Sequence, residues 1–185
     1  MKQETQIQEG GWQDQYASAI GGFNVMEFEK DKHTIYPLRL KYSFLCELNE
    51  HFILYKVNGK KGDIHKKVRE YSEKNDSEMQ RTANMKRLAY DIRDCLLNQN
   101  IKRIPDILHD NWMLKRNKFT TNKKVDDIYK LAMKNGAEAG KLCGSGSCGH
   151  MLLFVKPENR NKLIASLDKK NIVDFNFSVN GVETW

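Results

Sequence analysis

An acidic residue lies between two glycine pairs near the start of the sequence. Residues 10–24 read GGWQDQYASAIGGFN, and Asp14 is the acid. A carboxylate in such a glycine-bordered segment can accept or orient the proton of a substrate hydroxyl group. Asp14 can also cap a helix that begins with the following QYASAI. The local pattern favours neither interpretation over the other.

A second glycine-rich stretch, GKLCGSGSCGH, occupies residues 140–150. Glycine permits positive φ angles and a close approach of a phosphate, and successive exposed N–H groups form an anion-binding nest. The candidate residues are Gly144, Ser145, Gly146, Ser147 and Gly149. The stretch matches neither the Walker A pattern nor the dinucleotide fingerprint. A flexible glycine-rich turn is the alternative interpretation.

The same stretch contains Cys143, Cys148 and His150 within eight residues. This C-x4-C-x-H spacing does not match a zinc finger, and the sequence offers no second ligand pair, so no metal site is expected. Cys148 and His150 are also not expected to act as nucleophile and base, because neighbouring loop positions rarely point at each other.

Composition favours a soluble globular protein of 185 residues, with 39% hydrophobic and 30% charged residues. The first ten residues are polar and resemble no secretory signal, and no apolar run is long enough to span a bilayer, so we expect a cytoplasmic protein without a membrane partner. The net charge of +7 attracts anions, with a local lysine excess at 56–69 that a solvated helix face or loop also explains. No nucleic-acid partner is expected, because no recognisable reading motif accompanies the charge.

Hydrophobic periodicity predicts the elements that must position these residues. Strands are predicted at 22–29, 33–38, 51–57, 151–155 and 172–181, and helices at 41–50, 79–98, 101–118, 124–135 and 157–169. The first two strands form a hairpin, and the last alternates apolar and polar residues. The order of strands and helices predicts an α+β fold, with helices on one face of a mainly antiparallel sheet.

Together the stretches GGWQDQYASAIGGFNVMEF and GAEAGKLCGSGSCGHMLLFV resemble the GHMP small-molecule kinases. The ending VDFNFSVNGVETW adds to a similarity with the C-terminal half of the D-glycero-D-manno-heptose 7-phosphate kinase branch. The resemblance implies that residues 1–58 are the end of the GHMP N-terminal domain and carry Asp14. Residues 59–185 would be the ferredoxin-like GHMP C-terminal domain.

The resemblance also implies a reaction, the transfer of the ATP γ-phosphate to a hydroxyl group of a sugar such as heptose 7-phosphate. Asp14 would be the catalytic acid, and the 144–149 segment would shape the nucleotide phosphate site. Substrate-binding positions carried over from the motifs are Gln13, Tyr16, Gly21, Gly22 and Lys141. ATP and Mg²⁺ are the implied cofactors, with magnesium ligands mostly in a half of the family architecture that this sequence lacks.

Several positions depart from the family pattern. The ATP loop Pro-x-x-x-Gly-Leu-Gly-Ser-Ser-Ala is absent from the sequence, which predicts a truncated kinase that is inactive alone. Ser147 and Cys148 stand where glycines are usual, and His150 replaces an aromatic residue. A lysine-rich segment at 55–63 replaces Thr-Gly-x-x-Arg.

A non-catalytic sugar-phosphate binding or interaction module is the alternative to a truncated kinase. It would pair with a second chain that supplies the N-terminal half. A half-enzyme would expose the apolar face that its absent half covers, so self-association into a homo-oligomer is also expected.

Overall fold

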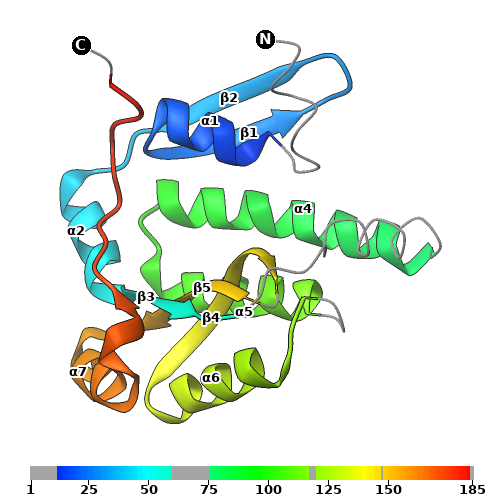
Figure 1. The fold of residues 1–185 in the computed structure, drawn as a ribbon. Helices are drawn as coiled ribbons and strands as arrows, with labels where there is room; N and C mark the ends of the chain where they lie inside the picture. Colours follow the sequence, from blue (N-terminus) through cyan, green and yellow to red (C-terminus); the bar gives the residue numbers. More distant parts are fainter. Residues whose placement is uncertain (1–11, 60–75, 117–119, 147, 184–185) are drawn as a thin grey trace.

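The computed structural model describes residues 12–59, 76–116, 120–146 and 148–183 of the chain (Figure 1). Its first elements are α1 (Gln13–Ile20), β1 (Phe23–Phe28), β2 (His33–Leu38), α2 (Tyr42–His51) and β3 (Phe52–Val57). The middle contains α4 (Asp76–Leu97), η2 (Ile101–Arg103), α5 (Ile104–Lys115) and α6 (Lys123–Lys134). The last part contains β4 (Ala137–Gly146), β5 (Cys148–Val155), α7 (Pro157–Ser166), η3 (Lys169–Asn171) and β6 (Ile172–Val173).

Two antiparallel sheets organise these elements. β1 and β2 form the predicted hairpin, in which Phe23 pairs with Leu38 and Phe28 with His33. The larger sheet has the order β4-β5-β3-β6, so β3 and β5 occupy its centre. Figure 1 shows the hairpin, α4, the larger sheet and the pair α6 and α7 as successive layers from top to bottom.

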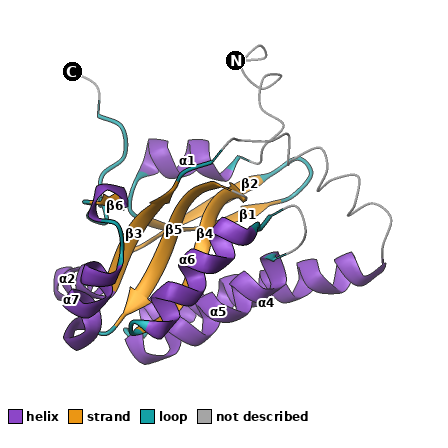
Figure 2. Cartoon of the chain, turned by 60° about the horizontal axis from the view of Figure 1, so that its bottom comes forward, coloured by secondary structure: helices purple, strands orange, loops and turns teal. Residues whose placement is uncertain are grey.

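The larger sheet is apolar on both faces, because successive side chains of a strand point to opposite sides. On β5, Met151 and Leu153 contribute to a core cluster with α6 and α7, whereas Phe154 contributes to a second cluster with α2 and α4. Figure 2 shows the sheet with helices around it. The α+β class with an antiparallel sheet is confirmed, but the helices cover both faces rather than one, since both faces carry buried side chains.

Two segments differ from the sequence-based expectation. Residues 137–146 form strand β4 and pair with β5, although their glycines and serines indicated a loop. Residues 172–181 were expected to be a strand, but only Ile172 and Val173 pair with β3, and the rest continues as extended chain. Residues 137–146 have low strand propensity, but backbone hydrogen bonds to β5 stabilise them as a strand.

The predicted domain division at residue 58 stays a prediction. β3, which that division assigns to the first segment, pairs along its whole length with β5, from Phe52 opposite Phe154 to Val57 opposite Gly149. Most of the basic run 56–69 lies outside the described residues. No helix in the described part of the chain is long and apolar enough to cross a membrane.

Candidate active site

Asp14 lies in the first turn of α1 and is exposed to solvent. Trp12 occupies the N-cap position, so the alternative in which Asp14 caps the helix does not hold. Among the described residues, the backbone oxygen of Asp14 accepts a hydrogen bond from Ser18 Oγ at 2.9 Å, whereas its side-chain carboxylate takes part in no hydrogen bond or ion pair. Among the described residues the carboxylate therefore has no competing partner, and it remains available to a hydroxyl group from solution.

The neighbouring positions on α1 have different surroundings. Gln13 is exposed, whereas Tyr16 is half-buried and its hydroxyl lies 3.0 Å from His33 Nδ1. The ring of Tyr16 also packs 6.0 Å from that of Phe28, measured between centroids. Tyr16 thus attaches α1 to the β1–β2 hairpin, a structural role that the sequence did not reveal. The first glycine pair, at 10–11, lies outside the described residues.

The second glycine pair ends α1 at a crossing with the C-terminal tail, defined here as residues 174–183. Gly21 is the C-cap with φ +70°, and a Cβ there would overlap the backbone of Asn180 and Gly181. Gly22 donates its N–H to Ser178 O at 3.1 Å. Gly21 is needed because the two backbones pass too closely for a side chain, and Gly22 has φ +67°, a conformation that favours glycine.

The C-terminal tail is anchored to the larger sheet through Phe177. Its ring lies 5.0 Å from Phe23 of β1 and 5.6 Å from Phe52 of β3, between centroids. Its backbone N–H donates to Asn49 Oδ1 at 3.1 Å. The tail therefore connects the end of α1, and with it Asp14, to the rest of the chain.

The glycine-rich stretch forms the turn end of the β4–β5 hairpin. Gly146 pairs with Cys148, and the register shifts between Cys143 and Gly146, as at a β-bulge. Gly144 has φ +83°, and no heavy atom lies within 4 Å of a Cβ built there. Ser145 belongs to β4, whereas Ser147 lies outside the described residues. Residues 140–143 pair with β5 as a strand, so the turn interpretation does not hold for them, and for the rest of the stretch it stays a prediction.

Two lysines lie beside this bulge. Lys141 Nζ donates to Asn111 Oδ1 at 2.8 Å. Lys115 Nζ donates to the backbone oxygens of Leu142 and Gly144, at 3.1 and 2.6 Å. Burial lowers the pKa of both lysines. The charge of Lys141 lowers the pKa of Lys115 further. Sequence analysis selected Lys141 but missed Lys115, which looked like an ordinary basic residue at a helix end.

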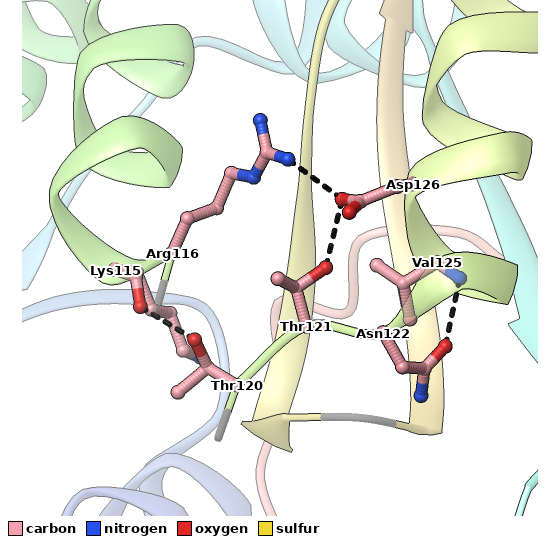
Figure 3. Close-up of polar contacts among 7 residues, drawn as sticks. All are labelled: Lys115, Arg116, Thr120, Thr121, Asn122, Val125 and Asp126. Atoms are coloured by element: carbon pink, nitrogen blue, oxygen red, sulfur yellow. Dashed lines mark hydrogen bonds and ion pairs between the residues drawn. The ribbon is translucent and has the colours of Figure 1, made fainter. Parts of the chain in front are cut away.

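A polar network lies at the end of α5 and the start of α6, and it includes a contact with the backbone of Lys115 (Figure 3). Thr120 Oγ1 donates to Lys115 O at 2.7 Å, and Arg116 pairs with Asp126 at 2.7 Å. Asn122 caps α6 by accepting a hydrogen bond from Val125 N at 3.0 Å. The end of α5 is therefore anchored, so the Lys115 ammonium has a defined position over the bulge.

In the described part of the chain, Cys143 and Cys148 are free cysteines, and neither forms a hydrogen bond with His150. Cys143 lies opposite His150 in the β4–β5 register, while Cys148 is buried. Over the residues that the structure describes, no group of three or more His, Cys, Asp and Glu side chains could hold a metal ion.

A pocket of about 590 Å³ separates β1 from α4. Apolar side chains make up much of its lining, and its polar and charged lining residues are Asn24, Glu27, Glu29, Lys86, Tyr90 and Arg93. Tyr90 donates a hydrogen bond to Glu27 Oε1 at 3.0 Å, which raises the pKa of Tyr90. Sequence analysis missed this pocket because its two walls come from segments that are distant in the sequence.

The two candidate stretches lie in different layers of the fold. In the view of Figure 1, α1, which carries Asp14, lies in the upper layer with the β1–β2 hairpin, whereas β4 and β5 belong to the larger sheet drawn below α4. Lys115, Lys141 and Gly144 come together at the hairpin, whereas Gln13, Asp14 and Tyr16 share α1. The convergence of both groups on one substrate stays a prediction.

Comparison with known proteins finds similarity to the GHMP kinases. Residues 92–173 match the family model for the C-terminal domain of GHMP kinases. The chain is 36% identical, over 185 residues, to D-glycero-alpha-D-manno-heptose 7-phosphate kinase of Campylobacter jejuni. That match covers 95% of this chain and 54% of the relative. The resemblance to the C-terminal half predicted from the motifs is thereby confirmed.

Solved structures of related kinases also match nearly the whole of this chain and about half of their own length. A D-glycero-D-manno-heptose 1-phosphate kinase from Bacteroides thetaiotaomicron has a TM-score of 0.70 and 27% identity, covering 97% of this chain and 50% of that one. L. major mevalonate kinase, at 16% identity, has a TM-score of 0.69 over 92% of this chain and 53% of its own, and shows the fold alone. The chain spans about half the length of the relatives it matches.

Proposed function

We propose that this chain forms the acceptor-binding and C-terminal part of an ATP-dependent sugar kinase, because residues 92–173 match the family model for the C-terminal domain of GHMP kinases. The reaction is the transfer of the γ-phosphate of ATP to a hydroxyl group of a heptose phosphate or a similar sugar phosphate. The observation that carries the proposal is the 36% identity to a heptose 7-phosphate kinase across 95% of the chain.

Asp14 is the catalytic residue in this proposal. Its carboxylate orients the acceptor hydroxyl and accepts its proton as the oxygen attacks the γ-phosphate. The exposure of Asp14 and the anchoring of α1 by the C-terminal tail support this role. A fixed helix holds the carboxylate in one orientation, which phosphoryl transfer needs because it depends mainly on positioning and charge neutralisation.

The β4–β5 hairpin contacts the phosphate groups. Gly144 and the neighbouring Lys141 supply space and positive charge. Magnesium, which usually binds through one or two carboxylates together with substrate phosphates, would neutralise the charge of ATP. The described residues offer no cluster of ligands for it, so we assign no magnesium ligand to this chain.

A non-catalytic sugar-phosphate module that pairs with another chain is the second candidate. The observation that favours it is the exposure of large aromatic side chains on the β1–β2 hairpin, where Phe28 is 43% and Tyr36 is 52% exposed. A partner chain could cover this surface and supply the ATP loop. In both cases, the 185-residue chain alone is expected to show no ATP-dependent sugar phosphorylation.

Calorimetric titration with heptose 7-phosphate, with a hexose phosphate and with ATP–Mg tests the proposal. Asp14→Asn should weaken sugar-phosphate binding about tenfold, because a hydrogen bond to a charged group is worth roughly 1.5–3 kcal/mol. Asp31→Asn is the matched control, since Asp31 is an exposed acid in the β1–β2 turn. Sugar-phosphate binding that is absent, or that is equal in Asp14→Asn and the unmodified chain, would contradict the assignment.

A further inference from the structure

Cys143 lies close to basic side chains near the turn end of the β4–β5 hairpin. It belongs to β4, just before the register shift, and its free thiol is half-buried. Cys143 stands directly opposite His150 of β5. Directly opposed residues of an antiparallel pair share one face of the sheet, with Cβ atoms roughly 4.5–5.5 Å apart. The imidazole of His150 is therefore a neighbour of the thiol.

The ammonium group of Lys115 is held beside the same cysteine. Lys115 Nζ donates to Leu142 O at 3.1 Å and to Gly144 O at 2.6 Å. These carbonyl groups belong to the residues immediately before and after Cys143, so the ammonium group lies along the backbone that carries the thiol. Both acceptors are uncharged, so these hydrogen bonds do not neutralise the positive charge of Lys115.

Lys141 adds a second positive charge from the same strand. Its side chain shares a face of β4 with Cys143, because the two residues are two positions apart. Lys141 Nζ donates to Asn111 Oδ1, an uncharged acceptor, at 2.8 Å. Burial is the largest cause that lowers the pKa of Lys115 and of Lys141, and the charge of Cys143 raises the pKa of both. This attraction is mutual, so the two ammonium groups favour negative charge beside Cys143.

The other cysteines have different surroundings. Cys95 and Cys148 are buried, and burial raises the pKa of the Cys95 thiol. Cys46 is exposed on α2, where Glu47 follows it and Glu50 lies four positions further along the helix. Side chains four positions apart are neighbours on a helix surface, so Cys46 has an acidic neighbour. Cys46 is therefore a natural control for Cys143, with an accessible thiol and the opposite local charge.

We propose that Cys143 is a site of thiol–disulfide exchange with small anionic disulfides, which Lys115 and Lys141 attract to the thiol. The Cys143 thiolate attacks one sulfur of the disulfide, so that a new S–S bond forms as the original S–S bond breaks. The thiol proton passes to solvent, and the released thiolate takes up a proton from solvent. The cysteine sulfur is oxidised and the leaving sulfur is reduced, so the disulfide itself is the oxidant. The inference does not depend on the proposed kinase function.

A comparison of two reagents tests this site in the unmodified chain. Oxidised glutathione carries a net negative charge, whereas cystamine is a disulfide with two ammonium groups. Peptide mass spectrometry gives the rate of adduct formation at each cysteine. The ratio of the glutathione rate to the cystamine rate should be about tenfold or more higher at Cys143 than at Cys46, on the scale of one ion pair near a protein surface. Salt at about 1 M should reduce this difference, because it screens the attraction.

Variants separate the charge of Lys115 from the general accessibility of the thiol. Lys115→Met should slow the reaction of Cys143 with oxidised glutathione about tenfold, whereas Lys115→Arg keeps the charge and should retain most of the rate. Lys134→Met is the matched control, because Lys134 is an exposed lysine in the last turn of α6. Cys143→Ser should remove this adduct and leave the reaction of Cys46 unchanged.

The reagent comparison needs no variant, so it decides the matter even if Lys115→Met fails to fold. No adduct at Cys143 in a protein whose Cys46 reacts would overturn the site. An equal reagent ratio at the two cysteines, or an equal rate at Cys143 in Lys115→Met and Lys134→Met, would also overturn it.

Discussion

The C-terminal tail crosses the end of α1 so closely that we expect Gly181→Ala to disturb the contact between them. A Cβ at Gly181 would overlap the carbonyl group of Ala19 and lie 2.7 Å from the carbonyl carbon of Ile20. Both neighbours are backbone atoms, so they cannot move aside as a flexible side chain would. The substitution must therefore either shift α1 or detach the tail from it.

The two outcomes cost similar amounts of free energy. Overpacking a tight contact typically costs about 1–3 kcal/mol. Detaching the tail loses the hydrogen bonds from Val182 N to Ser18 O and from Gly22 N to Ser178 O, at about 1 kcal/mol each. We therefore expect a loss of about 2 kcal/mol in the free energy that keeps the tail in place.

Amide hydrogen exchange measures this local free energy directly. A loss of about 2 kcal/mol corresponds to roughly 30-fold faster exchange at Val182 and Gly22. Asn176→Ala is the control, because Asn176 is an exposed residue of the same tail and its change should stay within about 0.5 kcal/mol. Unchanged exchange at Val182 and Gly22 in Gly181→Ala would refute the close crossing of the two backbones.

Two further predictions concern the core and the lysine pair. Leu153→Ala removes a side chain with 0% exposure from the centre of the sheet and should lower the free energy of unfolding by about 2–5 kcal/mol in urea, whereas Leu97→Ala, at a site 49% exposed, should change it little. Burial is the largest cause that lowers the pKa of Lys115. The positive charge of Lys141 lowers this pKa further, and the charge of Cys143 raises it. At pH values between the lowered pKa of the folded protein and the usual value near 10.4, the unfolded chain binds more protons than the folded protein. The free energy of unfolding of the unmodified protein should therefore rise relative to that of Lys115→Met as pH increases through this window. A stability difference that does not vary with pH would show that Lys115 titrates as an ordinary lysine.

Local patterns predicted most of the elements because helices and strands bury faces with their own periods. The predicted α4 stripe comprises Met85, Leu88, Ala89, Ile92, Cys95 and Leu96. The structure buries Leu88, Cys95 and Leu96, whereas Met85 and Ile92 are half-buried and Ala89 is exposed. The alternation correctly separated half-buried Val173, Phe175 and Phe177 from their exposed polar neighbours, but Val179, which it placed on the same face, is exposed. It could not show that the tail lacks a strand partner, since pairing depends on what lies beside it.

The glycine-rich stretch at 140–150 shows where prediction from local composition failed. Its composition indicated a loop, because glycine and serine have low strand propensity. The hairpin forms because β5 is a buried central strand with Met151 and Leu153 fully enclosed, and β4 pairs with its free edge. Tertiary pairing therefore overrode local propensity at a candidate site.

The sequence by itself determined the type and order of most elements, the α+β class and the similarity to the GHMP kinases, because these depend on local periodicity and on short motifs. Only the tertiary structure decided that Lys115 reaches Gly144 and that the tail crosses Gly21. Each of these contacts joins residues distant in the chain. Their proximity follows from the packing of whole elements, which no local pattern encodes.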